Sequence, residues 1–106
     1  MTTQLDEVMA ALSPEIRRGL QKASEVTIEK QPVPSFGLNR ALQGGLPYGR
    51  QVLIWGNKSA GKSTFCLQTA ALAQADGKVC AWIDSEKSFD PEWARKVGVK
   101  TDELIY

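Results

Sequence analysis

Eight consecutive residues, from Gly56 to Ser63, read G-N-K-S-A-G-K-S and match the pattern G-x-x-x-x-G-K-[ST] without a break. Successive backbone N–H groups of such a loop can surround several phosphate oxygens, and its glycines supply the unusual backbone angles that this requires. Lys62 adds a mobile positive charge for the β- and γ-phosphates, and the hydroxyl of Ser63 can coordinate Mg²⁺. The octapeptide therefore predicts a binding site for a nucleoside triphosphate and its magnesium ion.

The segments on either side of this loop are those that a phosphate site requires. Gln51–Trp55 is a short apolar run that predicts a strand, and Thr64–Ala75 is rich in helix formers and free of glycine and proline. This context argues against a chance match on a surface turn, because the helix adds unpaired N–H groups and the positive end of its dipole. The candidate phosphate-binding residues are Gly56, Asn57, Lys58, Ser59, Ala60, Gly61, Lys62, Ser63 and Thr64.

A second apolar run follows the helix and indicates a parallel sheet. Asp76-Gly77 predicts a turn, and Lys78–Asp84 (K-V-C-A-W-I-D) predicts a strand. Two strands joined by a crossover of helix length predict a parallel pair in a right-handed βαβ unit. Pro91–Val97 is expected to form a short helix capped by Asp90 or a near neighbour, and Leu104–Tyr106 to begin a third strand. The expected fold class is therefore α/β.

The N-terminal region predicts helices with an exposed apolar stripe. Residues 3–12 place four apolar side chains at i, i+3, i+4 and i+7, on one side of a helix. Ser13-Pro14-Glu15 then predicts a fresh helix start, so two short helices and one kinked helix fit equally well. The stripe must pack on its own domain or on a neighbouring subunit, and both remain open. Its members are Leu5, Val8, Met9 and Leu12.

The connection from these helices to the phosphate loop contains a candidate strand, a linker and a short helix. Val26–Glu29 alternates apolar and polar residues, which predicts a half-exposed strand. Lys30–Pro34 (K-Q-P-V-P) predicts an extended linker, because its prolines exclude a helix. Leu38–Leu42 is expected to form a brief helix that ends at Gly44 and Gly45.

Composition excludes several classes of protein. The 106 residues suffice for one small domain, and shares of 42% hydrophobic and 24% charged residues are ordinary for a soluble chain. The formal net charge of +1 argues neither for nor against nucleic acid. No apolar run approaches the roughly 18 residues of a membrane span, and no signal peptide is present, so we expect a cytoplasmic protein. Cys66 and Cys80 lack metal-site spacing and are expected to be buried thiols.

Three stretches carry a resemblance to a known family. They are G-L-N-R-A-L-Q-G-G-L-P-Y-G-R from Gly37, G-N-K-S-A-G-K-S-T as the phosphate loop, and A-W-I-D-S-E-K-S-F-D-P-E-W-A-R-K-V-G-V from Ala81. They resemble the bacterial and phage RecA recombinase family, and the third is the most diagnostic because few other NTPases share it. The resemblance implies a RecA-like P-loop NTPase core that is incomplete here. It divides the chain into residues 1–34, a helix, strand and linker for subunit assembly, and residues 35–106, the beginning of the ATPase core.

The resemblance also implies roles for single residues. Glu86 matches the family's catalytic glutamate, which polarises the water that attacks the γ-phosphate, and it follows a strand at the edge where open α/β sheets bind ligands. Asp90 and Trp93 match the positions that hold adenine by a hydrogen bond and by stacking, with Trp93 in place of the usual tyrosine. Asp84 is a candidate for orienting Glu86 or the metal's water. Asn57-Lys58 replaces a proline and an acid that are usual in the family's loop.

The implied function is that of an ATP-dependent DNA recombinase with ATP and Mg²⁺ as cofactors. Its subunits would associate head to tail as a filament on single-stranded DNA, for homologous recombination and repair. The family's DNA-binding loops and its later apolar run ending in Asp are not among these residues, so we expect an N-terminal fragment of a DNA-dependent ATPase that is inactive alone. The alternative is a short non-catalytic RecA-like module that modulates recombinase assembly. A small-molecule kinase or a hexameric helicase-type ATPase would share the loop but not the stretch from Asp84 to Gly98.

Overall fold

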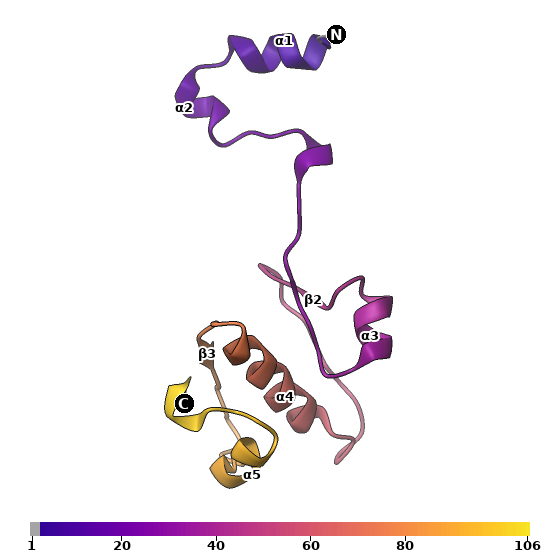
Figure 1. The fold of residues 1–106 in the computed structure, drawn as a ribbon, viewed down its shortest axis with the longest axis vertical. Coiled ribbons are helices and arrows are strands. Elements are labelled where there is room, and N and C mark those ends of the chain that lie inside the picture. The colour runs from indigo at the N-terminus through magenta and orange to yellow at the C-terminus, as the bar shows by residue number, and fades with distance from the viewer. Residues whose placement is uncertain (1–2) are drawn as a thin grey trace.

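The computed structural model describes residues 3–106, in which short helices and strands are joined by extended segments (Figure 1). Within this range, no helix combines the length and the apolar character that crossing a membrane would need. The helices are α1 (Gln4–Ala11), α2 (Pro14–Arg17), α3 (Phe36–Ala41), α4 (Lys62–Ala75) and α5 (Pro91–Lys96), with 3₁₀ turns at Ala23–Glu25 and Thr101–Glu103. The strands are β1 (Lys30–Gln31), β2 (Leu46–Pro47), β3 (Cys80–Ala81) and β4 (Leu104–Ile105).

Local capping explains where α1 and α2 begin. The Thr3 hydroxyl accepts a hydrogen bond from the Asp6 N–H (3.2 Å), and the Asp6 carboxylate accepts one from the Thr3 N–H (2.9 Å), which together form a capping box. The Ser13 side chain caps α2, and Pro14 occupies its first position. Of the two expected arrangements, the structure therefore has two short helices.

Contacts at two places hold the N-terminal segment together. The Arg17 guanidinium donates hydrogen bonds to the carbonyl oxygens of Ala10 (2.7 Å) and Leu12 (2.9 Å), at the end of α1. Lys22 Nζ lies 2.5 Å from Asp6 Oδ1, and its hydrogen bond holds the pKa of the Asp6 carboxyl well below its usual range. Because this ion pair is on the surface, solvent weakens its contribution to stability. These contacts make the first helices a small unit of their own.

This N-terminal unit projects away from the rest of the chain (Figure 1). The radius of gyration is 19.7 Å and the extents are 59 × 29 × 24 Å, whereas a compact domain of 100 residues has a radius of gyration of about 13 Å. No residue of α1 is buried, and the side chains of Leu5 and Val8 are 50% and 56% exposed. Within residues 3–106, the apolar stripe of α1 is therefore not covered by the chain's own core.

The connection to the core differs from the sequence prediction. The strand expected at Val26–Glu29 is wrong, because these residues are exposed and form no strand. The strand β1 lies instead at Lys30–Gln31, in the segment expected to be a free linker, and pairs antiparallel with β2. Val33 is buried, which anchors the remainder of that segment. The alternation of apolar and polar residues at Val26–Glu29 did not predict a strand correctly, because a strand forms only where a second strand accepts and donates its backbone hydrogen bonds. The division of the chain at residue 34 stays a prediction.

Close backbone approach and one amide side chain shape the unit formed by β1, α3 and β2. The Asn39 side chain accepts a hydrogen bond from the Val33 N–H (2.8 Å) and donates one to the Val33 carbonyl (2.7 Å). Gly45 has a φ of +129°, and a Cβ there would lie 2.0 Å from the Gln31 carbonyl oxygen. Only glycine therefore allows the chain to pass β1 at this distance. The brief helix expected at Leu38–Leu42 is confirmed as α3, which begins two residues earlier.

The segment that precedes the phosphate loop is not a strand. Gln51–Trp55 pairs with no other strand of residues 3–106, and its Leu53 and Trp55 side chains are 85% and 84% exposed. The expected parallel pair between this segment and Lys78–Asp84 is therefore wrong. Strands that follow each other in sequence are neighbours only about two-thirds of the time, so an apolar run does not reveal its partner. With side chains of α3, β2 and α4 the segment lines an open apolar groove; among the lining residues are Leu38, Leu42, Leu46 and Phe65.

The parallel sheet consists of β3 and β4, with α5 between them in sequence. Cys80 lies opposite Leu104 and Ala81 opposite Ile105, and the Trp82 N–H donates a further hydrogen bond to the Ile105 carbonyl (2.8 Å). The strand expected at Lys78–Asp84 is thus reduced to two residues. The strand start expected at Leu104 is confirmed as β4. The coarse fold class, mixed α/β with a small parallel sheet, is confirmed.

A small core joins α4 to α5. Leu67, Ala94 and Val99 are buried together, and partly buried apolar side chains pack around them: Ala71, Trp82, Phe89, Val97 and Leu104. The buried side chain of Gln74 donates to the Lys100 carbonyl (3.0 Å) and accepts from the Lys100 N–H (2.9 Å), which ties α4 to the chain after α5. The phosphate loop leads into α4, and Glu86 precedes α5. This core therefore sets the position of the phosphate loop relative to Glu86.

The two cysteines are free thiols. Cys66 lies on α4 and Cys80 on β3, and both are partly buried, whereas the sequence predicted buried thiols. Desolvation raises the pKa of both thiols, so both are protonated at neutral pH. Residues 3–106 contain no group of three His, Cys, Asp or Glu side chains that could hold a metal ion.

Candidate functional site

The phosphate loop leads into α4 through a left-handed turn. Gly61 precedes the helix with a φ of +95°, and Ser59 also has a positive φ (+62°). Left-handed residues in such a loop turn successive N–H groups toward one concavity, which is typical of anion sites. No side chain caps α4, so the N–H groups of its first turn have no intrahelical acceptor and no substitute for one. The end of a 14-residue helix is therefore left open for a ligand with acceptor oxygens.

Lys62 lies folded over the loop that it follows. Its Nζ donates hydrogen bonds to the carbonyl oxygens of Gly56 (2.9 Å) and Asn57 (2.7 Å). The Ala60 N–H donates to the same Asn57 carbonyl (3.2 Å), which closes the turn between the two glycines. Lys58 is exposed at the surface of the loop. The ammonium group is thus held against the phosphate loop by two carbonyl oxygens of that loop.

A pocket of about 280 Å³ lies over this helix start. It is lined by Ser59, Gly61, Lys62, Ser63 and Thr64. Gly56 and Ala60 border the apolar groove instead, whereas Asn57 contributes its carbonyl to Lys62. The donors fit a phosphate chain, and the Ser63 hydroxyl fits one position of a magnesium ion. Since the described residues offer no cluster of acidic ligands here, such an ion would depend on phosphate oxygens and water for most of its coordination.

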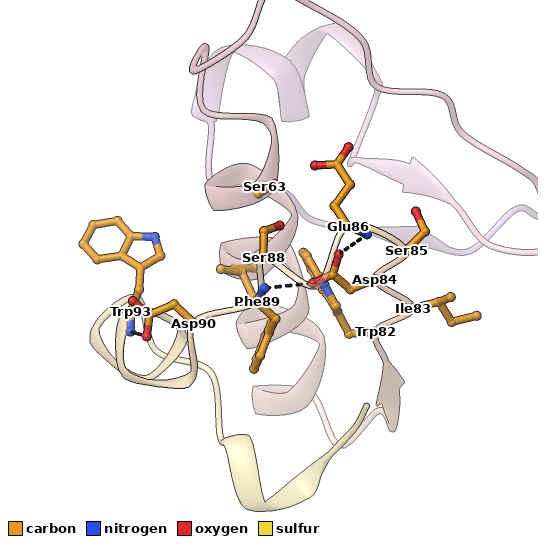
Figure 2. Close-up of a pocket in the computed structure, with 11 residues that line it drawn as sticks. Ser63, Trp82, Ile83, Asp84, Ser85, Glu86, Ser88, Phe89, Asp90 and Trp93 are labelled. Atoms are coloured by element: carbon orange, nitrogen blue, oxygen red, sulfur yellow. Dashed lines mark hydrogen bonds between the residues drawn. The ribbon is translucent and has the colours of Figure 1, made fainter.

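A second pocket, of about 290 Å³, shares one lining residue, Ser63, with the first. It brings together Glu86, Asp90 and Trp93, which sequence reasoning had assigned separately to catalysis and to base binding. Figure 2 shows Glu86 on the loop after β3 and Trp93 on α5, with Ser63 of α4 between them in this view and Ile83 pointing away. The Glu86 carboxylate is exposed and has no hydrogen-bond partner among residues 3–106. The arrangement can therefore hold a water beside a phosphate chain at one end and a flat ring at the other.

Asp84 shapes the loop that carries Glu86. Its carboxylate accepts hydrogen bonds from the N–H groups of Glu86 (3.1 Å) and Phe89 (2.8 Å), as Figure 2 shows, and from the Tyr106 hydroxyl (3.4 Å). Desolvation acts to raise the pKa of Asp84, but these backbone N–H groups outweigh it and hold the pKa below its usual range. Of the two roles considered for Asp84 from sequence, the geometry favours orienting Glu86.

Asp90 and Trp93 are fixed by the start of α5. Asp90 Oδ1 caps the helix by accepting from the N–H groups of Glu92 (2.9 Å) and Trp93 (3.2 Å), so the cap is Asp90 and not a neighbour. Its second carboxylate oxygen has no partner among the described residues. The Trp93 ring is 45% exposed, and its Nε1–H donates to the Thr64 hydroxyl (3.3 Å). The sequence predicted Thr64 only as a phosphate ligand. Its hydrogen bond with Trp93 joins residues far apart in the sequence, so no local sequence pattern indicates it.

Sequence reasoning also missed residues that line the second pocket. Ser85 and Ser88 contribute hydroxyls beside Glu86, and Phe89 closes the pocket toward the core. Phe89 packs between Trp82 (6.0 Å between ring centroids) and Tyr106 (5.0 Å). The only signal for the serines was their place in D-S-E-K-S, directly after a strand at the ligand-binding edge of the sheet.

A glycine-rich loop that opens a helix, followed by a parallel strand with carboxylates beyond its end, is the arrangement of the phosphate-loop class of α/β proteins. Within this class, the chain belongs to the family described as the RecA N-terminal domain, whose model matches residues 5–106. The resemblance to the RecA family that the sequence indicated is therefore confirmed.

Curated relatives named Protein RecA agree with this assignment. The protein from Marinobacter nauticus is 47% identical over 105 residues, which cover 91% of this chain and 30% of the relative. The protein from Cutibacterium acnes is 49% identical over 87 residues, covering 81% of this chain and 25% of the relative. The protein from Parvibaculum lavamentivorans is 51% identical over 81 residues, covering 76% and 22%. The chain thus spans less than a third of the length of these relatives.

Proposed function

We propose that this chain is the N-terminal part of the ATPase core of a RecA-type DNA recombinase, which binds ATP with Mg²⁺ between the phosphate loop and α5. Family membership supports this function, and the relatives at 47–51% identity are named Protein RecA. The observation that carries the proposal is that Ser63 lines two neighbouring pockets. One offers the donors at the start of α4, and the other offers Glu86, Asp90 and Trp93.

In this proposal, each part of the site has one task. Residues Gly56 to Thr64 bind the phosphates through backbone N–H groups, Lys62 supplies positive charge, and Ser63 provides a hydroxyl for the metal. Trp93 offers a ring face for the base and Asp90 a free carboxylate oxygen for an amino group. Glu86, held by the loop that Asp84 shapes, orients and polarises a water for attack. Mg²⁺, when bound with the nucleotide, neutralises developing charge on the phosphate oxygens.

The proposal extends to assembly and to DNA. The exposed stripe on α1 and the projecting N-terminal unit support a role of this unit in binding the next subunit, so that head-to-tail contacts repeat as a filament. Single-stranded DNA would be the partner of the whole recombinase, as the family resemblance implies. The short non-catalytic module remains the competing function, and hydrolysis in a longer protein separates the two.

The test of nucleotide binding is the variant Lys62→Ala, titrated with Mg·ATP by calorimetry. We expect its affinity to fall by about 1–3 kcal/mol in binding free energy, the scale of a charge-assisted hydrogen bond, because the phosphates then retain backbone donors only. The matched control is Lys96→Ala, which removes an exposed charge from α5 outside both pockets. Equal affinities for the parent and Lys62→Ala would refute the proposed site.

A further inference from the structure

The phosphate loop and the base pocket share a direct side-chain contact. The indole Nε1–H of Trp93, on α5, donates a hydrogen bond to the hydroxyl of Thr64, on the first turn of α4 (3.3 Å). The same helices are packed together next to this contact by Leu67 and the fully buried Ala94. The bond therefore joins two side chains at the surface whose helices are already packed together beneath them.

This bond constrains a side chain that would otherwise turn freely. Trp93 is nearly half exposed, and its ring borders the second pocket on the side of Ser63. Its backbone is already fixed, because its N–H is bound by the Asp90 cap. The side-chain torsions are the remaining freedom, and the bond to Thr64 restricts them before a ligand arrives. A ring that is ordered in advance loses less conformational entropy on stacking than a mobile one.

Thr64 also belongs to the phosphate pocket, so one residue adjoins both halves of the site. Its backbone lies in the uncapped first turn of α4, whereas its side chain is turned toward α5. We infer that the Thr64 hydroxyl is a positioning group for the nucleobase: it fixes the Trp93 ring as one wall of the base pocket and links that wall to the helix turn that holds the phosphates. The inference rests on the proposed nucleotide site and assigns to Thr64 a task separate from phosphate binding.

Removing the hydroxyl, the indole N–H, or both tests this role. Thr64→Val keeps the shape of the side chain without its hydroxyl, and Trp93→Phe keeps an aromatic face without the N–H. The affinities of the 106-residue chain for Mg·ATP and for magnesium tripolyphosphate, which has no base, are measured side by side by calorimetry. The control Thr69→Val removes another hydroxyl of α4, one that bonds only to the Phe65 carbonyl (2.8 Å).

We expect Thr64→Val to weaken Mg·ATP about threefold to tenfold, the effect of one net hydrogen bond, and to leave tripolyphosphate within twofold of the parent. Thr64→Ser keeps the hydroxyl and should restore ATP binding. In the double variant, Thr64→Val should add nothing to the loss caused by Trp93→Phe, because the two side chains act through one bond. Thr69→Val should bind both ligands as the parent does.

Three outcomes overturn the inference. If Thr64→Val weakens tripolyphosphate as much as ATP, the hydroxyl acts on the phosphates. If the losses of the two single variants add in full, the bond between them has no role in binding. If the parent binds neither ligand, both the proposed nucleotide site and the positioning role are wrong. If the parent binds ATP tightly and the losses are additive, only the positioning role is wrong. If Thr64→Val fails to fold, Trp93→Phe alone is the test. A loss of affinity for ATP without a loss for tripolyphosphate supports the inference, and equal losses for the two ligands contradict it.

Discussion

The carboxylate of Asp84 stabilises the loop beside the candidate site through its negative charge. Its carboxylate binds the backbone N–H groups of Glu86 and Phe89, and its pKa lies below the usual range for that reason. A carboxyl group whose pKa is lower in the folded state stabilises the fold above its unfolded pKa of about 3.9, and this contribution is lost as the pH falls through the folded value.

Asp84→Asn should therefore be less stable than the parent at pH 7, and this difference should shrink as the pH is lowered from about 5 to 3. The measurement is the urea midpoint of both chains at pH 7, 5 and 3. Asp102→Asn, an exposed acid of the second 3₁₀ turn, is the control for the loss of one negative charge. A difference that stays constant over this range would show that Asp84 acts through shape and not through charge.

Glu86 carries the chemical step in the proposed function, and its free carboxylate makes a clear prediction. In a longer protein that hydrolyses ATP, Glu86→Gln should bind ATP as the parent does and lose turnover roughly a hundredfold or more, because the amide keeps the shape but cannot act as a base. The measurement is phosphate release at saturating ATP, with the exposed Glu92→Gln as control. Turnover above about a tenth of the parent rate would mean that another group activates the water.

At the scale of elements, the contact between β1 and the chain before β2 depends on one glycine. A Cβ at Gly45 would meet the backbone of Gln31 and Pro32, whereas a Cβ at Gly49, which also has a positive φ (+73°), would meet nothing within 4 Å. Comparing alanine substitutions at Gly45 and Gly49 therefore distinguishes the cost of backbone strain from the cost of steric overlap. Gly49→Ala should lose about 1–2 kcal/mol of unfolding free energy from the left-handed backbone.

Gly45→Ala should lose roughly 1–3 kcal/mol more than Gly49→Ala, because β1 must also move. Urea unfolding followed by circular dichroism measures both variants. Equal losses would mean that β1 and β2 can separate without affecting the fold. Since residues 48–55 connect β2 to the phosphate loop, the larger loss should be accompanied by weaker ATP binding in Gly45→Ala alone.

The elements that could be predicted from sequence are those with local causes. Ser13 and Asp90 cap the helices that they precede, as the sequence predicts, and Thr3, which was not predicted as a cap, caps α1. The strands were predicted less well, because their partners are distant. Gln51–Trp55 has the composition of a strand but no strand beside it, and β1 formed within a proline-containing segment because Leu46 and Pro47 were available to pair with it.

The same distinction applies to the candidate site. The phosphate loop is one continuous motif, so its residues were found together. Glu86, Asp90 and Trp93 were found through the family resemblance, and only the packing of α5 on α4 brings them to Ser63. The bond between Trp93 and Thr64 joins residues 29 positions apart and depends on that packing, so composition and spacing contain no trace of it.

For the whole molecule, the elongated shape places the unit that we propose for assembly apart from the unit that we propose for nucleotide binding. Four apolar side chains of the α1 stripe, if buried against another subunit, would contribute about 6–10 kcal/mol before the costs of association. We expect a longer protein to form large assemblies with ATP and single-stranded DNA, and a form that lacks residues 1–24 to lose them. Met1 and Thr2 lie outside the described residues and are removed with the rest.

Sedimentation velocity of both proteins with ATP and single-stranded DNA measures this difference. A paired substitution, Leu5→Gln with Val8→Gln, should reproduce the loss while keeping the helix, and Glu7→Gln should not. Large assemblies from the deleted form would show that other surfaces are sufficient, and the assembly role of α1 would be wrong.

The unpaired segment Gln51–Trp55 has a consequence for how the isolated chain behaves at high concentration. Its residues are uncharged and favour β structure, and they contain no proline or glycine that would interrupt stacking. The backbone of this segment pairs with no strand of residues 3–106, so identical segments from several chains can add to one another as a cross-β ladder. Arg50 and Lys58, whose like charges would repel between stacked copies, flank it on both sides. We therefore expect Arg50 and Lys58 to limit this stacking, and high salt, which screens their charges, to promote precipitation of the chain.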